Sequence, residues 1–168
     1  MPKLNTHLHL GSKLSEVINI KDINSFLLGN VYPDCWNTSI EKSLEYHYKD
    51  TLSSFCNLES FKMNEEMNDF NLGYYFHLWI DNRILKEDIG DITKYDCLIC
   101  DMPVIAPIIC QFKEYKACGK EYQSIQNILE LETEPMPLYL VSEEKKKRYY
   151  SILDKLVSEF VFEYFCDK

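Results

Sequence analysis

The sequence predicts an all-α fold, and three observations support this prediction. Apolar residues recur at helical spacing through much of the chain, whereas strand-like alternation is scarce. Only 5 Gly and 6 Pro are available for the turns that a β-protein needs. The 168 residues are 46% hydrophobic and 27% charged, which supplies enough apolar side chains for one hydrophobic core. We therefore expect a single-domain helical bundle over residues 1–168.

Composition also narrows the class of protein. The net charge of −9 argues against broad binding to a phosphate backbone, so no nucleic-acid surface is expected. No apolar run approaches the roughly 18 residues of a membrane span, and the N-terminus lacks the apolar segment of a signal peptide. We expect a cytoplasmic protein without a membrane span, whose oligomeric state is left open. The 7 cysteines are expected to be mostly free thiols.

The first helix is predicted over Thr6–Asn19, with the Thr6 side chain as its cap. By helical spacing, His7 falls on the apolar face with Leu10, whereas His9 joins Lys13 on the polar face. The pattern therefore predicts that His7 is buried and that His9 is exposed.

The next predicted helix is short and covers about Asp22–Leu28, where a Gly-Asn pair ends it. Pro33 disfavours a helical conformation in the residue before it, which places Asp34 on a loop. The segment Ser43–Lys49 is expected to form a turn or short helix that carries His47.

A longer helix is predicted from about Leu58 or Glu65 to Lys86, with a break near Asn71 as an option. Its centre, residues 72–81, is apolar nearly all round, which is typical of a helix buried on most sides. The exceptions are His77 and Asp81.

The remainder of the chain, residues 86–168, is predicted to be helical without a readable motif. The segment after Asp88 is expected to be looser, because it contains several prolines. Helices are predicted over about Lys120–Glu132 and from Ser142 to about Phe165.

The spacing of His77 and Asp81 is the strongest chemical signal. Residues four apart on a helix project from the same face, so one imidazole and one carboxylate can converge on an ion. With Asp34 and His47 they make a plausible tetrahedral zinc set, and His7 could be a further ligand. The alternatives are structural. His77 and Asp81 could form a buried hydrogen bond, or Asp81 could reach water, while His7 could be a core residue, Asp34 a turn residue and His47 a surface residue.

The order of these residues resembles the zinc-dependent phospholipase C family, which is related to the phospholipase C/P1 nuclease fold. The matching stretches are Thr6-His7, residues 26–34, His47 after a tyrosine, and residues 72–81; together they cover about residues 1–85. The resemblance implies that Asp34, His47, His77 and Asp81 hold one zinc. It also implies that His7 ligates a neighbouring metal, with Asp81 as a bridge.

The activity implied by this resemblance is hydrolysis of a phosphoric ester, by a phosphodiesterase or phospholipase C-like reaction with metal-activated water. One or two zinc ions, or another divalent transition metal, are expected as cofactor. The substrate would be a small phosphate ester or a lipid. Asp34 is the candidate general base, and Arg83 and Tyr74 are candidate substrate contacts, with a surface salt bridge and core packing as their alternative roles.

Two departures from the family motivate other interpretations. Secreted members begin with a metal-ligating tryptophan and carry further histidines downstream, whereas this chain begins Met1-Pro2 and has no histidine after His77. The alternative function is a catalytically degenerate, metal-stabilised binding or interaction domain. A metal-free helical protein is a third reading, and the Cys97–Cys100 pair with Cys110 and Cys118 leaves a zinc knuckle open.

Overall fold

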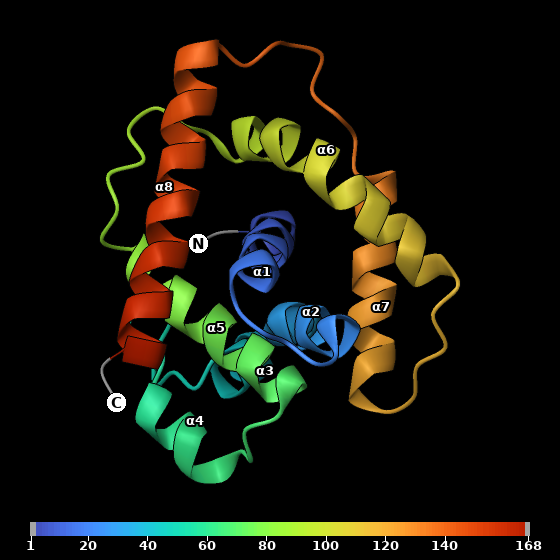
Figure 1. Ribbon diagram of the computed structural model, residues 1–168, viewed down its shortest axis with the longest axis vertical. Helices are drawn as coiled ribbons and strands as arrows, with labels where there is room; N and C mark the ends of the chain where they lie inside the picture. The colour runs from blue at the N-terminus through green and yellow to red at the C-terminus, as the bar shows by residue number, and fades with distance from the viewer. Residues whose placement is uncertain (1–2, 167–168) are drawn as a thin grey trace.

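Figure 1 presents the computed structural model of the chain, which describes residues 3–166. The described residues form eight α-helices and, as predicted, an all-α fold. The helices are α1 (Leu4–Val17), α2 (Ile23–Val31), α3 (Ile40–Tyr46), α4 (Leu58–Asn64), α5 (Asp69–Ile84), α6 (Lys94–Lys113), α7 (Lys120–Glu130) and α8 (Glu143–Val161). Short 3₁₀ helices cover Tyr32–Trp36 and Leu131–Thr133, and a π-helical turn, Phe162–Cys166, follows α8.

Helix α1 lies at the centre of the molecule. It contacts α2, α5, α6 and α8, and Figure 1 shows α6 arching over it while α8 runs along one side. Because helices cover α1 on several sides, eight of its residues are buried. This packing places both His7 and His9 in the interior, where they are 0% and 2% exposed. The prediction that His9 is exposed was wrong, because neighbouring helices cover its polar face too.

The contact between α2 and α5 is the most extensive one between helices. Two glycines allow the backbones to meet. A Cβ atom at Gly29 would lie 1.8 Å from the Phe70 carbonyl oxygen, and one at Gly73 would lie 2.0 Å from that of Phe26. No side chain larger than hydrogen fits at either position without moving a backbone.

The predicted boundaries in the first half need four adjustments. Helix α2 continues through the Gly29-Asn30 pair that was expected to end it and stops at Val31. Helix α1 begins before Thr6, whose hydroxyl donates to Asp101 instead of capping the helix. The long predicted helix is divided into two helices, α4 and α5. Asn68 caps α5 by accepting a hydrogen bond from the Asn71 amide. Asp34 lies in a 3₁₀ helix rather than a loop, since Pro33 fits the first turn of such a helix.

The expectation of a loose segment after Asp88 was wrong for α6. Thr93 and Asp96 form a reciprocal capping box that starts the helix, and Pro103 and Pro107 lie within it. Each proline removes one backbone donor, and burial of the apolar face against α1 offsets that loss.

Helix α6 is also long and apolar enough to cross a membrane by length and composition alone. A core helix meets the same criterion, and 39% of its most apolar window is buried against the rest of the chain. Asp101, in its middle, is 0% exposed and accepts hydrogen bonds from neighbouring helices. These contacts favour a core role for α6.

Candidate metal centre

The five predicted metal ligands come together where α1, the 3₁₀ helix Tyr32–Trp36, the end of α3 and α5 meet. Four of them, His7, His47, His77 and Asp81, are at most 1% exposed. The Asp34 side chain is 11% exposed. Their potential ligand atoms form two overlapping groups, within each of which all atoms lie within 4.8 Å of one another. The first group is His7, His77 and Asp81. The second is Asp34, His47 and His77.

The two imidazoles His47 and His77 each lie close to both carboxylates, Asp34 and Asp81. The Nε2 atoms of His47 and His77 lie 3.3 Å apart, and they lie 3.5 Å and 3.9 Å from Asp34 Oδ1. Asp81 Oδ2 lies 3.7 Å from the first nitrogen and 3.9 Å from the second. A tetrahedral zinc with ligands at about 2.0–2.1 Å holds its ligand atoms about 3.3–3.4 Å apart. Five distances among these atoms, 3.3–3.9 Å, approach this spacing, so His47 and His77 can share an ion with either aspartate after small movements.

Backbone carbonyls orient both imidazoles of this set. His77 Nδ1 lies 2.8 Å from the Asn30 carbonyl oxygen, and His47 Nδ1 lies 2.7 Å from that of Ser43. Each carbonyl can only accept, so each Nδ1 carries the proton and donates it. The Nε2 atom of each ring is thereby directed at the centre, as in protein metal sites where a second group fixes the ligating imidazole.

Asp81 faces a third imidazole with its other oxygen. His7 Nε2 lies 3.3 Å from Asp81 Oδ1, and the His7 ring stacks on that of His77 with 3.6 Å between centroids. Both nitrogens of His7 and both oxygens of Asp81 are buried without a hydrogen bond from any described residue. Buried polar atoms are normally satisfied, and a bound ion or water is what usually satisfies such atoms in a native site. These orphaned atoms support the fit to a metal.

The protonation states suit metal ligands. Burial and the proximity of His7 lower the pKa of His77 to about 3, so this imidazole is neutral. Burial alone would raise the pKa of Asp34 and Asp81, but the neighbouring histidines outweigh it and lower both. Burial disfavours a charged His47, yet its hydrogen bond with Asp34 outweighs this and raises the pKa of His47 above its ordinary value. An ion binding there would have to displace that proton.

The two predicted substrate contacts are engaged elsewhere. Arg83 pairs with Glu163 and lies over the Trp79 ring, 5.2 Å from its centroid. The Tyr74 hydroxyl donates to the Tyr46 carbonyl oxygen at 2.5 Å. These contacts match the alternative roles of both residues, a salt bridge for Arg83 and packing for Tyr74.

The seven cysteines are free thiols, as expected. Cys110 and Cys118 are exposed whereas Cys100 is buried. Among the described residues, the groups close enough to hold an ion contain no cysteine, so the zinc knuckle gains no support.

Sequence reasoning missed two features of the centre. Lys49, whose side chain is 4% exposed, places Nζ 4.0 Å from Asp81 Oδ2. Asn30 accepts from His77 and donates through Nδ2 to the His7 carbonyl oxygen, so it links two candidate ligands. The Gly-Asn pair at the end of α2 was visible in the sequence, but it was interpreted only as a helix end.

A second buried polar cluster lies beside the centre on α1. Asp101 Oδ2 accepts from Asn5 at 2.7 Å and from Thr6 at 3.0 Å, while its Oδ1 lies 2.7 Å from His9 Nδ1. The Tyr149 hydroxyl, on α8, donates to the same carboxylate at 2.8 Å. This cluster joins α1, α6 and α8, and Asn5 and Thr6 immediately precede His7.

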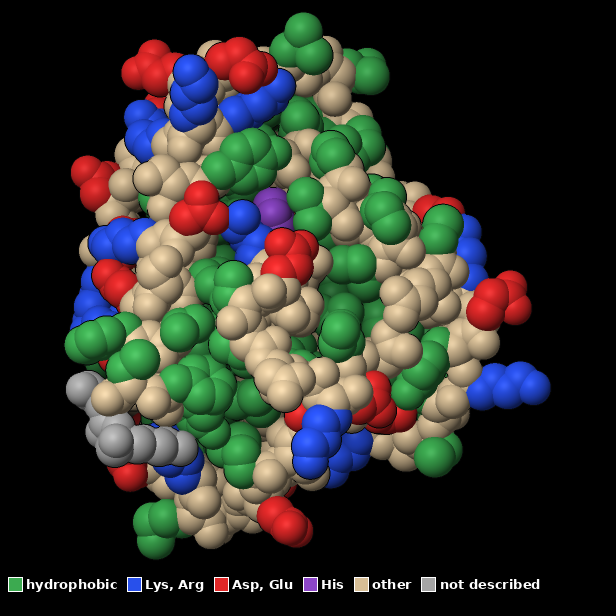
Figure 2. All heavy atoms as spheres, viewed as in Figure 1, with side chains coloured by type: hydrophobic (Ala, Val, Ile, Leu, Met, Phe, Trp, Pro, Cys, Tyr) green, Lys and Arg blue, Asp and Glu red, His purple; other side chains and the backbone are tan. Residues whose placement is uncertain are grey.

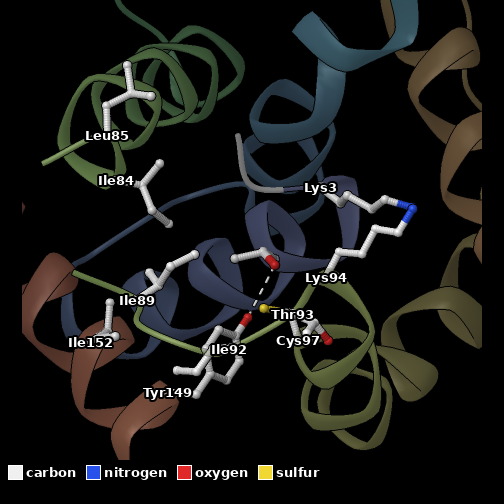
Figure 3. A pocket seen from close by; sticks show the side chains of 11 residues that line it. Lys3, Ile84, Leu85, Ile89, Ile92, Thr93, Lys94, Cys97, Tyr149 and Ile152 are labelled. Carbon is white, nitrogen blue, oxygen red and sulfur yellow. Dashed lines mark hydrogen bonds between the residues drawn. The ribbon is translucent and has the colours of Figure 1, made fainter. Parts of the chain in front are cut away.

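Asp34 connects the centre to the surface. It lines a polar cavity of about 330 Å³ together with Asn5, Lys3 and Lys94. The two lysines also line an apolar cavity of about 210 Å³ (Figure 3), whose walls include Ile84, Ile89, Ile92 and Ile152. Figure 3 shows both lysines on the side of this cavity away from Ile84 and Ile152. A ligand beside Asp34 therefore has two cationic groups at one end and an apolar compartment beyond them.

Charge is mixed over the face of the molecule seen in Figure 2. Lys and Arg side chains alternate there with Asp and Glu, and hydrophobic side chains gather between them. This face therefore shows no large surface of a single charge.

Comparisons of the chain with protein-family models, with curated proteins and with solved structures find no match. The resemblance to the zinc-dependent phospholipase C family thus stays a prediction, carried by the order of residues in the sequence.

Proposed function

We propose that this chain is a metal-dependent hydrolase of phosphoric esters, with a phosphodiesterase or phospholipase C-like activity. The observation that carries the proposal is that the Nε2 atoms of His47 and His77 lie 3.3–3.9 Å from one another and from a carboxylate oxygen of Asp34 and of Asp81. Zinc is the cofactor we propose, because it prefers nitrogen and oxygen ligands in this geometry. When bound, zinc supplies charge neutralisation at a phosphoryl group and lowers the pKa of water.

The residues around the centre suggest how a substrate is bound. The chain carries a net charge of −9, so an anionic ester gains little from the overall field. Lys3 and Lys94 supply positive charge locally, on the wall of the cavity that Asp34 also lines. The apolar cavity beside them accommodates an uncharged ester group of a small molecule or a lipid.

Asp34 is the candidate general base. It is the most exposed of the four ligands and the one that borders the polar cavity. Its lowered pKa keeps the carboxylate ionised at neutral pH, so it can accept a proton from a water that attacks phosphorus. Asn37 donates to Asp34 Oδ1 at 3.2 Å and holds the carboxylate in place.

The test combines metal content with turnover. We expect purified protein, reconstituted with zinc, to retain the metal and to hydrolyse bis(4-nitrophenyl) phosphate. His77→Ala and Asp81→Asn should lose both properties, because each removes one ligand and leaves its partners unpaired. Asp91→Asn is the matched control, since the Asp91 side chain is 69% exposed and pairs with Arg148.

Each outcome decides between the functions. Zinc with turnover, both lost in the two ligand variants, supports the hydrolase. Zinc without turnover of this and other phosphodiesters contradicts the hydrolase and favours the metal-stabilised binding domain. Absence of zinc after reconstitution contradicts both and leaves a metal-free helical protein.

A further inference from the structure

Lys49 places a buried cation beside the candidate ligands. Its Nζ lies 4.0 Å from Asp81 Oδ2, and its side chain is 4% exposed. The same carboxylate oxygen lies 3.7 Å from His47 Nε2 and 3.9 Å from His77 Nε2. An ammonium group therefore borders the tetrahedral set itself and not the protein surface.

A tight backbone turn places the Lys49 side chain beside Asp81. Tyr48, between His47 and Lys49, has a φ of 51°, in the left-handed region that a bulky residue rarely adopts. The turn is held by the Lys49 amide, which donates to the Leu44 carbonyl, and by the Tyr48 carbonyl, which accepts from Asn57. Through this turn His47 and Lys49, two residues apart, both approach Asp81. Strain of this kind persists where the surrounding structure holds it, and it is frequent at functional sites.

Within residues 3–166, the two groups offer too few ligands for two complete ions. Both overlapping groups include His77, but its Nδ1 is committed to the Asn30 carbonyl, which leaves Nε2 for a single ion. If His77 binds the ion of the tetrahedral set, the remaining ligand atoms in these groups for a second ion are His7 Nε2 and Asp81 Oδ1. Two protein ligands are fewer than the three or four that hold zinc in proteins.

Charge leads to the same conclusion. Two carboxylates and three imidazoles face the centre in the described residues, and Lys49 adds one positive charge. With neutral imidazoles, one divalent ion changes the net charge of this buried group from −1 to +1. A second divalent ion would leave an excess of three positive charges in a site shielded from water, which is strongly unfavourable.

We propose that the centre holds one divalent ion, and that the Lys49 ammonium group takes the place of a second cation beside Asp81. This inference rests on the proposed metal centre and sets its stoichiometry. Lys49 acts here as a positioning and charge-balancing residue, through Asp81.

The test is zinc binding to the full chain after metal has been stripped with a chelator. Titration calorimetry and metal analysis should give one equivalent of zinc for the wild type. Lys49→Met should bind the ion at least about tenfold more tightly, because it removes a positive charge close to the ion. Lys49→Arg keeps the charge and should remain within about threefold of the wild type. Lys62→Met is the control, since this exposed lysine lies over the Tyr75 ring.

The possible results separate this inference from the proposed function. Two equivalents in the wild type, or an unchanged or weaker affinity in Lys49→Met, overturn the role of Lys49 while the metal centre stands. Absence of zinc in the wild type overturns the centre itself. Should Lys49→Met fail to fold by circular dichroism, the stoichiometry of the wild type and the affinity of Lys49→Arg still decide.

Discussion

His7 and His9 show how two neighbouring histidines of one helix acquire different roles. Helical spacing places them on different faces of α1, and both faces are buried. His7 meets Asp81 at the candidate metal centre, whereas His9 meets Asp101 on α6. Which carboxylate each histidine contacts depends on which helix covers its face.

Replacing His9 should therefore affect stability and spare the metal. In His9→Gln the Asp101 carboxylate loses its 2.7 Å contact with His9 while it stays buried. We expect the free energy of unfolding to fall by about 1–3 kcal/mol. Urea denaturation measures this loss, and metal analysis should find wild-type zinc content. Loss of zinc together with unchanged stability would contradict the assignment of His9 to the Asp101 cluster.

At the scale of elements, the pair α2 and α5 forms the base of the centre. Gly29 and Gly73 let the two backbones touch, and this contact brings the Asn30 carbonyl within 2.8 Å of His77 Nδ1. The sequence showed both glycines inside apolar segments. The sequence did not show why they are glycines, because the close approach of the two backbones depends on both helices together.

Gly73→Ala should disturb both folding and metal binding. Its Cβ would lie 2.0 Å from the Phe26 carbonyl oxygen, so α2 and α5 must separate, and we expect a loss of about 3 kcal/mol in stability. The separation also moves the Asn30 carbonyl from His77, so zinc affinity should fall by about 10–100-fold. Gly119→Ala is the control: with φ 61°, ψ −132° and no atom within 4 Å, it should cost only backbone strain of about 1–3 kcal/mol and leave zinc affinity unchanged. Equal effects of the two variants, measured by denaturation and zinc titration, would refute the tight contact.

The continuous helix α6 could not be predicted from local sequence patterns. Its capping box, Thr93 and Asp96, was present in the sequence, yet Pro103 and Pro107 led to the expectation of a looser segment. The penalty of a proline is local, whereas the gain from burying Ile105, Ile109 and Phe112 arises only once the rest of the chain is folded around them.

For the whole molecule, the candidate ligands join segments that are far apart in the sequence. One divalent ion would connect the 3₁₀ helix Tyr32–Trp36, the end of α3 and α5, with His7 of α1 beside them. Because binding to the native state alone stabilises it, zinc at 100 times its Kd should add about 2.7 kcal/mol to the free energy of unfolding.

This stabilisation should depend on pH through His47. In the metal-free protein its raised pKa stabilises the fold below the unfolded value of about 6.5, and this contribution is lost as pH rises through the raised pKa. Zinc must displace the same proton, so its affinity increases with pH. We expect the zinc-induced increase in Tm to be larger at pH 8 than at pH 6, measured by thermal denaturation. An increase that is equal at both pH values, or that survives in Asp81→Asn, would count against this centre.

The sequence by itself determined the helical class, most helix positions in the first half, and the five residues that gather at the centre. It could do so because helical periodicity is local and because ionisable residues stand out in apolar segments such as 72–81. Only the tertiary structure decided that His9 is buried, that α6 continues through two prolines and that Lys49 faces Asp81. Each of these depends on contacts between segments distant in sequence, whose burial and charge no local pattern records.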